Sequence, residues 1–295
     1  MTFFAQQTVN GIALGSVFAL LALGVTLVWG VLNVLNFAHA QFMTWGAFGT
    51  AFGVSRGYPV ILCIAIGIAT AALLALVVDE VIVTPLKRRP STDPSGFVVA
   101  TIGVGLILET LIKMASNSEL RAFSVDGIPQ GSVTVAGVSM GQLQLTILGT
   151  TLAVMVALGL WLSRSRRGRE LRTVAYSQEV AELLGINTRV SFAIAFIISG
   201  ALAALAGTFV GEQTAIISFS SGDNLLLITF AAIVIGGMGS VPGSVLGGLV
   251  LGLGQVLTGA YVSDAVSNVI PFALMVAVLL FRPTGLIRQQ VVARA

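Results

Sequence analysis

The feature that most constrains this chain is a succession of long apolar stretches that carry almost no charge. A helix that crosses a bilayer needs about 20 predominantly apolar residues. The candidates are 9–31, 37–54, 59–83, 97–115, 143–162, 191–212, 225–237, 241–260 and 267–281. Stretch 37–54 opens with polar residues, and 225–237 is too short to cross unaided. We therefore expect an all-α polytopic membrane protein with 8–9 transmembrane helices, one of them broken or half-spanning.

Composition supports this class and excludes others. Hydrophobic residues make up 56% of the chain and charged residues only 9%, whereas a soluble domain carries roughly 25% charged residues. This excludes a soluble enzyme or a disordered chain, and a net charge of +3 is too small to predict a nucleic-acid partner. We treat residues 1–295 as a single transmembrane domain.

Basic residues predict the orientation, because cytoplasmic loops of membrane proteins are enriched in them. Twelve of the fifteen lie in three segments, 85–96, 163–190 and the tail after Phe281. They are Lys87, Arg88, Arg89, Arg164, Arg166, Arg167, Arg169, Arg172, Arg189, Arg282, Arg288 and Arg294. Two spans separate the first two segments. Four spans, or three plus a half-crossing that returns, separate the second from the tail, and we take them as four full spans. All three segments then face the cytoplasm, as does the C-terminus, while 116–142 forms an external loop. The first 55 residues carry no charge, so the side of the N-terminus stays open.

Glycines spaced four apart predict closely packed helices, since they let two helix backbones approach. The clearest set is Gly243, Gly247, Gly248 and Gly252. They serve packing within the chain or pairing with a second subunit.

Chemistry-bearing residues are scarce. The chain has one histidine, His39, one cysteine, Cys63, and two lysines, neither of which follows a Gly-x-x-x-x-Gly sequence. We predict no catalytic, metal-binding or cofactor-binding residues, no cofactor and no enzyme activity. If transport uses ATP, another chain must hydrolyse it.

Loop 163–190 contains a candidate docking helix. Ser177 can cap a helix and Gly185 can end it, while Val180, Leu183 and Leu184 form a short apolar stripe. About eight residues cannot form a stable helix alone in water. This helix must dock on its own membrane domain or on a partner, or else lie as an amphipathic linker on the bilayer surface.

The segment between the first two apolar stretches is polar. Asn33, Asn36 and His39 fall there, and polar groups at membrane depth usually face protein or a water-filled path. They line a translocation path, or they satisfy neighbouring helix ends. A further segment, 236–243, must form a tight glycine-rich turn.

Four ordered motifs carry a family resemblance. LNVLNFAH (32–39), AELLGI (181–186), GGMGSVPG (236–243) and FRPTGL (281–286) closely resemble the branched-chain amino acid ABC transporter permease family, and specifically its smaller, H-type subunit. The likeness spans about residues 9–286.

The resemblance implies an ATP-driven importer in a bacterial plasma (inner) membrane. It implies a homologous M-type permease subunit, two cytoplasmic ATPase subunits and an extracytoplasmic substrate-binding protein that loop 116–142 is long enough to contact. It also implies that segment 176–186 is the coupling helix that docks on an ATPase. The residues expected to act there are Tyr176, Glu179, Val180, Glu182, Leu183, Leu184 and Gly185.

The alternative function is an ion-gradient-driven secondary transporter of a small polar solute. Glu109 and Lys113 have the i, i+4 spacing of an intramembrane ion pair, and Asp79 with Glu80 lie near an inner helix end. Each also has a plain interpretation, because Lys113 can reach the outer interface and the two acidic residues lie near Lys87. The transported amino acid, urea or amide is not predicted by the sequence.

Overall fold

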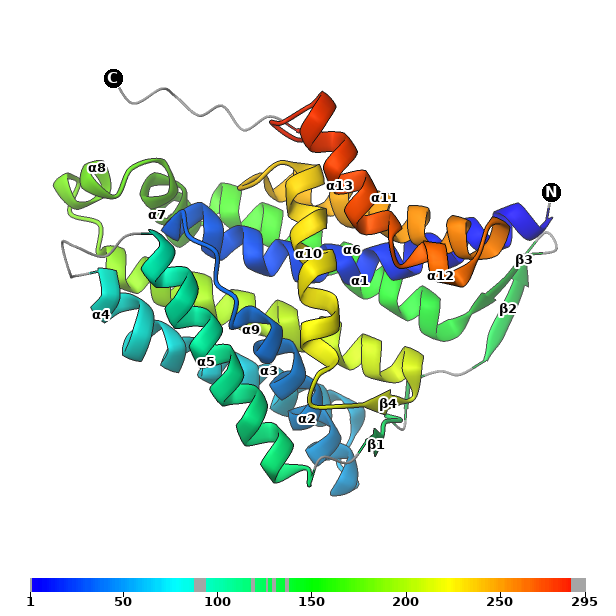
Figure 1. The fold of residues 1–295 in the computed structure, drawn as a ribbon. Helices are drawn as coiled ribbons and strands as arrows, with labels where there is room; N and C mark the ends of the chain where they lie inside the picture. The colour runs from blue at the N-terminus through cyan, green and yellow to red at the C-terminus, as the bar shows by residue number, and fades with distance from the viewer. Residues whose placement is uncertain are drawn as a thin grey trace.

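The chain is built almost entirely of helices, as a computed structural model shows (Figure 1). The structure describes residues 2–87, 94–117, 120–125, 127–128, 131–135 and 138–287. Arg88, Arg89, Glu119, Asp126, Arg288 and Arg294 lie outside this part of the chain. The prediction of an all-α polytopic membrane protein is confirmed.

Six helices of the described residues are long and apolar enough to cross a membrane. They are Thr2–Leu32, Val60–Lys87, Ser95–Ala115, Gln142–Arg164, Thr188–Thr214 and Val241–Tyr261. The first is α1, the second combines α3 (Val60–Val78), the π-helical turn η1 (Asp79–Val83) and α4 (Thr84–Lys87), and the third lies within α5 (Pro94–Ala115). The last three are α6, α9 and α11.

Three shorter helices complete the bundle, namely α2 (His39–Ser55), α10 (Ser221–Gly236) and α13 (Ile270–Phe281). Stretch 267–281, expected to be one span, is split between α12 (Asp264–Ser267) and α13. Pro271 occupies the first turn of α13, where a missing N–H costs no helical hydrogen bond.

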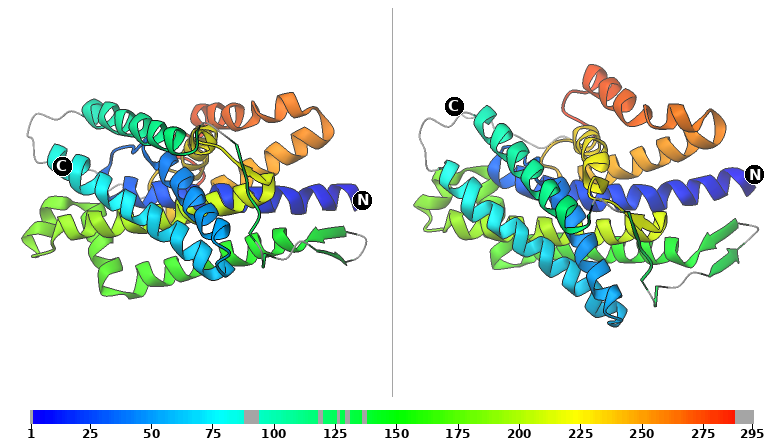
Figure 2. Two further views of the ribbon diagram at one scale, coloured as in Figure 1. Left: turned by 90° about the horizontal axis from the view of Figure 1, so that it is seen from below. Right: turned by 60° about the horizontal axis from the view of Figure 1, so that its bottom comes forward.

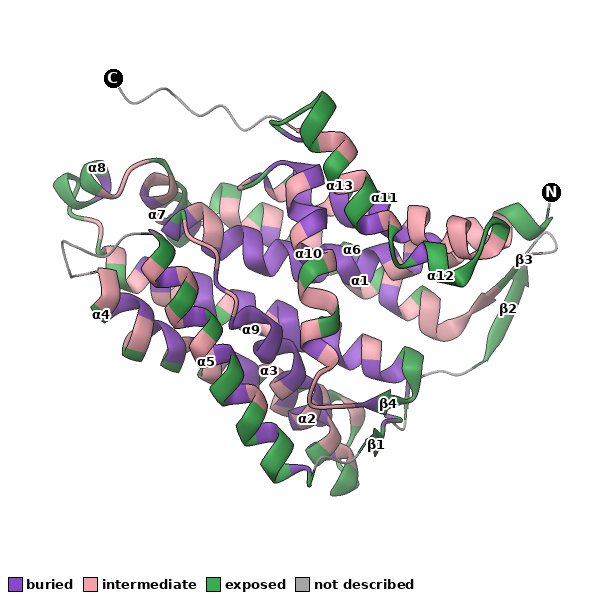
Figure 3. Cartoon of the chain, viewed as in Figure 1, coloured by how far each residue is buried: buried purple, intermediate pink, exposed green. Residues whose placement is uncertain are grey.

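Helix α1 is the centre of the molecule. Its sequence is apolar on every side, which is typical of a helix surrounded by protein, and 89% of its most apolar stretch is buried. The corresponding share is 61% for α9 and only 17% for α6. Figure 3 shows the same gradient, with α1, α2 and α9 largely buried and with exposed residues concentrated on α5, α8 and α13. The peripheral helices therefore offer the surface for lipid or partner chains.

Helices α2 and α10 both begin part-way along the bundle. The chain leaves α1 at Leu32, passes through residues 33–38 and starts α2 near the middle of α9, where the His39 side chain bonds to Ser199. Helix α10 starts against the first turn of α2, since the Gly222 amide donates to Thr44 Oγ1 at 3.0 Å. The predicted broken helix is therefore the α1–α2 region, and α10 is a second short helix.

Most of the basic residues that the structure describes lie at one end of the bundle, which we call the basic end; Arg56, Lys113 and Arg121 lie elsewhere. Helices α4, α7 (Arg166–Tyr176) and α8 (Gln178–Leu183) lie there (Figures 1 and 2). The segment after Arg282 lies against the turn between α10 and α11, where the Leu286 and Ile287 amides donate to Ile235 and Gly236. The run of arginines predicted as a loop is in fact helix α7, capped by Ser165.

The opposite end, which we call the hairpin end, carries short strands. Strands β2 (Ser132–Val135) and β3 (Val138–Gly141) form an antiparallel hairpin, and β1 (Arg121–Ala122) pairs with β4 (Ile216–Ile217). Gln6 of α1 bonds to the backbone of Ser139 through both amide atoms, at 2.6 and 2.8 Å. Loop 116–142 is thus not a bare connector in its described parts.

Candidate functional site

Helix α8 is closed at both ends by its own sequence. The Ser177 hydroxyl accepts a bond from the Val180 amide at 3.2 Å. After Leu183, Gly185 adopts a φ of +74°, a left-handed conformation that glycine reaches without strain. Ile186 then donates back to the Ala181 carbonyl at 2.9 Å. The sequence predicted both the cap and the glycine ending correctly.

The apolar stripe of α8 points away from the molecule. Leu183 is 87% exposed, Leu184 67% and Val180 41%, whereas Ala181 on the opposite face is fully buried. Three neighbouring large apolar side chains with no cover are expected at an interaction site. Tyr176, also exposed, is the last residue of α7 rather than part of α8.

The acidic residues of α8 differ in their contacts. Glu179 is exposed in the first turn, where a negative charge favours the helix dipole. Glu182 accepts a bond from Thr188 at the start of α9, at 3.2 Å. On α7, a hydrogen bond from Arg167 holds the pKa of Glu170 below its usual value.

Helix α8 is attached to the central helix. The Gln178 amide donates to the Val31 carbonyl in the last turn of α1 at 2.9 Å. Leu171 and Val174 of α7 are buried in the same core as the end of α1. A displacement of α8 would therefore act directly on the point where α1 ends.

Asn33 lies at this point. It follows α1 with a φ of +54° and lines a cleft of about 1450 Å³ at the basic end. The walls are the last turns of α1, the end of α6, helices α7 and α8, and the turn before α11. Lys87 and Arg172 supply positive charge to the walls.

Asn36 and His39 are buried and do not line this cleft. Asn36 Oδ1 accepts from the Ala38 amide at 3.1 Å, ahead of α2. His39 Nδ1 lies 3.0 Å from Ser199 Oγ, and its ring packs on Gly24, where an added Cβ would meet it at 2.8 Å. The structure thus separates Asn33 from the other two: Asn36 bonds within its own segment, and His39 bonds to α9.

A second polar contact, absent from the sequence-based prediction, joins the beginnings of α2 and α10. Gln41 Nε2 donates to both carboxylate oxygens of Asp223, at 3.0 and 3.1 Å. Gln41 is 1% exposed. The polar character of segment 33–41 was the available signal, but the sequence does not show that residue 223 faces it.

The four glycines of α11 lie in contacts within the chain. Gly248 and Gly252 face Ala19 and Gly15 of α1, while Gly243 and Gly247 face the α10 backbone. A Cβ at any of these positions would meet backbone atoms. This glycine face is therefore occupied by α1 and α10.

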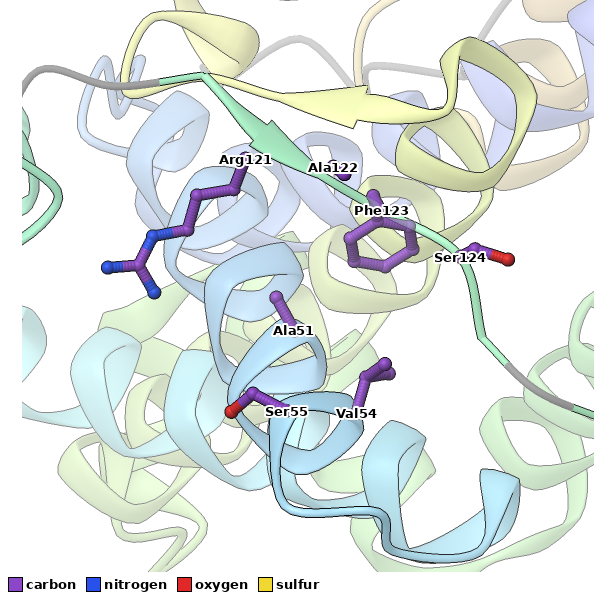
Figure 4. A pocket seen from close by; sticks show the side chains of 7 residues that line it. All are labelled: Ala51, Val54, Ser55, Arg121, Ala122, Phe123 and Ser124. Carbon is purple, nitrogen blue, oxygen red and sulfur yellow. The ribbon is translucent and has the colours of Figure 1, made fainter.

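A small pocket lies at the hairpin end, between the last turns of α2 and strand β1 (Figure 4). Its volume is about 170 Å³, and Val54, Ser55 and Phe123 are among the residues that line it. Phe123 is buried in a cluster with Val125 and Ile217, so the pocket marks the edge of a packed cap rather than an opening through the bundle.

The ionisable pairs of the alternative function have other partners. Lys113 Nζ lies 5.0 Å from the centre of the Phe219 ring, and no ion pair joins it to Glu109 in the described residues. Glu80 pairs with Arg189, and Asp79 accepts from Thr84 at 3.3 Å. Within the described residues, no group of three or more His, Cys, Asp or Glu side chains could hold a metal ion.

Comparison with known proteins shows the family. Residues 7–279 match the family described as branched-chain amino acid transport system / permease component. The chain is 31% identical to the permease protein BraD of a high-affinity branched-chain amino acid transport system in Pseudomonas aeruginosa, over 96% of this chain and 95% of that one. It is 32% identical to the LivH permease protein of Escherichia coli K12, over 97% and 96% of the two chains. A probable LivH protein from Methanocaldococcus jannaschii is 26% identical over 94% of this chain and 90% of its own length. The resemblance of the four motifs is confirmed, and this multi-pass membrane chain belongs to the permease component family of branched-chain amino acid transport systems.

Proposed function

We propose that the chain is one of the two membrane-spanning subunits of an ATP-driven importer of branched-chain or related amino acids. The similar permeases of Pseudomonas and Escherichia, named for branched-chain amino acid transport, support this substrate class. The partners are a homologous M-type permease subunit, two cytoplasmic ATPase subunits and an extracytoplasmic substrate-binding protein. The solute crosses between the two permease subunits.

One observation carries the proposal, namely the exposed apolar stripe of α8 on a helix that is capped, closed and attached to α1. So short a helix persists only because packing and caps hold it. Leu183 and Leu184 remain uncovered in the isolated chain. A groove on an ATPase subunit would bury them, which is the helix-in-groove mode of recognition.

The proposed orientation follows from charge. Arginines of α7, together with Lys87, Arg189 and Arg282, place positive charge at the basic end, and positive residues favour the cytoplasmic side of a bacterial inner membrane. The C-terminus and α8 then face the ATPases, and the hairpin end faces the binding protein. The N-terminus, tied to β3 by Gln6, is on the outer side.

In this mechanism, ATP binding draws the ATPase subunits together and displaces α8. The ATPases must bind the two permease conformations with different affinity, since only differential affinity can shift the equilibrium. The bond from Gln178 to the end of α1 provides the local connection to the membrane helices.

The test replaces Leu183 and Leu184 with aspartate in the assembled transporter in proteoliposomes. Solute-stimulated ATP hydrolysis should fall to the basal rate, while membrane insertion is retained. The control is Arg166→Asp, which adds a negative charge at an exposed position in the first turn of the preceding helix, α7, and removes an exposed ion pair that contributes little to stability. Retained stimulation in the double variant would contradict the coupling role.

The same vesicles separate the proposal from ion-gradient-driven transport. Uptake should require ATP, the ATPase subunits and the binding protein. Uptake by this chain alone under a proton or sodium gradient would favour the secondary transporter instead.

A further inference from the structure

The junction of α2 and α10 brings together acidic and amide oxygens, and within the described parts of the chain no basic residue forms an ion pair with them. Asp223 lies in the first turn of α10 and receives both bonds from Gln41. The negative charge of Glu109 on α5 also acts on Asp223. Lys113, one turn beyond Glu109, is placed over the Phe219 ring instead, and none of the ion pairs in the described residues includes either carboxylate.

Gln41 adds an independent indication that this junction binds a group from outside the chain. Its side chain is 1% exposed, and Oε1 has no hydrogen-bond partner among the residues that the structure describes. Nε2 of the same amide group donates to Asp223. Because Oε1 and Nε2 are bonded to the same carbon, Oε1 is a further acceptor close to that carboxylate. Buried acceptors are nearly always satisfied in folded proteins, so a donor from outside this chain is expected here.

The surroundings of the junction are apolar and held in place. Phe37, in the segment before α2, packs against Phe230 of α10 with ring centres 5.0 Å apart and ring planes tilted by 41°. Phe230 is seven residues, or two helical turns, after Asp223 and therefore lies on the same face of α10. The Gly222 amide bond to Thr44 fixes the two helix beginnings against each other. Acceptors thus lie two turns from an aromatic pair.

We propose that Asp223 and Gln41, aided by the negative charge of Glu109, receive the positively charged amino group of the solute as it crosses, with its aliphatic side chain toward Phe37 and Phe230. The site rests on the proposed function, since it assumes that an amino acid is carried. An ammonium group supplies three donors, one of which would satisfy Gln41 Oε1, and its positive charge offsets two carboxylates at membrane depth, where unpaired charge is costly. A lysine or arginine of the partner permease subunit has the same chemistry, and the test distinguishes the two sources.

The experiment uses the complete transporter in proteoliposomes, with radiolabelled leucine delivered by its binding protein. Uptake and stimulated ATP hydrolysis are measured together for Asp223→Asn, Glu109→Gln and the conservative Asp223→Glu. Leucine imported per ATP should fall on the order of tenfold in Asp223→Asn, the loss expected for one charge-assisted hydrogen bond, while stimulated hydrolysis persists. Glu109→Gln should change the ratio in the same direction, and Asp223→Glu should restore most of it.

The matched control is Asp264→Asn, which removes an exposed carboxylate in α12 at the hairpin end and should leave the ratio within about twofold. An unchanged ratio in both Asp223→Asn and Glu109→Gln would overturn the site. Failure of Asp223→Asn to co-purify with the partner permease would also overturn it, because the cation would then belong to that subunit. If the wild-type complex imports no amino acid, the proposed function itself fails, which separates the two results.

Discussion

Replacing Gly248 with alanine tests how closely α11 must approach the central helix. A Cβ at this position would lie 2.5 Å from the Ala19 nitrogen and 2.7 Å from the Ala19 Cα. Both are backbone atoms of α1, so no side-chain rotation can relieve the overlap. Ordinary contact begins at 3.4 Å, and the two helices must therefore separate locally by about 0.9 Å.

The energetic cost follows from this separation. Overpacking of a closely packed interior costs about 1–3 kcal/mol, and a backbone overlap belongs at the upper end of this range. Alanine recovers up to about 1 kcal/mol in helix propensity, which leaves a net loss of about 2 kcal/mol. Gly149→Ala on α6 is the matched control, since no atom lies within 4 Å of its Cβ position; it gains propensity without overlap.

The assay is thermal unfolding of the purified chain in detergent, and unfolding is monitored as the loss of the monodisperse peak. Gly248→Ala should melt several degrees below the unmodified chain, and Gly149→Ala should melt at or above it. Equal melting of the two variants would refute the reasoning, because it would mean that α1 and α11 separate at no cost or do not pack as described.

Two further predictions concern the basic end. Gly185→Ala places a side chain at a φ of +74° with open space around it, so its cost is backbone strain of about 1 kcal/mol. Hydrogen exchange of the backbone amides at the end of α8 should therefore become faster. Unchanged exchange would contradict the proposed helix ending. Arg189→Glu should lower the melting temperature by setting two acidic groups together, and adding Glu80→Arg should restore it. The gain from the restored pair should stay within about 1 kcal/mol, because both side chains are partly exposed; no recovery in the double variant would contradict the pair.

Local sequence signals predicted the helical elements well. The apolar stretches predicted the helices of the bundle. Ser177 and Gly185 predicted the two ends of α8, because helix caps and glycine endings depend on neighbouring residues. Helix α7 was missed because its arginines and polar residues indicate a solvated loop as readily as a helix. Its formation depends on Leu171 and Val174 packing in the core, a tertiary effect that the sequence pattern does not contain.

Contacts between distant residues could not be predicted in this way. Gln41 and Asp223 are separated by 182 positions, and only the placement of α10 against the start of α2 brings them together. The same holds for the glycines of α11. Their spacing indicated close packing, but the identity of the partner helix emerged only from the fold.

The polar segment after α1 connects the cleft beside α8 with the junction of α2 and α10. Asn33 lines the cleft beside α8, whereas Asn36 is hydrogen-bonded to Ala38 and His39 to Ser199. Gln41 alone among these four both bonds across to α10 and keeps a spare acceptor there. Because α8 is bonded to the last turn of α1, a shift of α8 reaches the α2–α10 junction through only residues 33–40. In the proposed mechanism, the break between α1 and α2 therefore lets a displacement of α8 move Gln41 without moving the whole of α1.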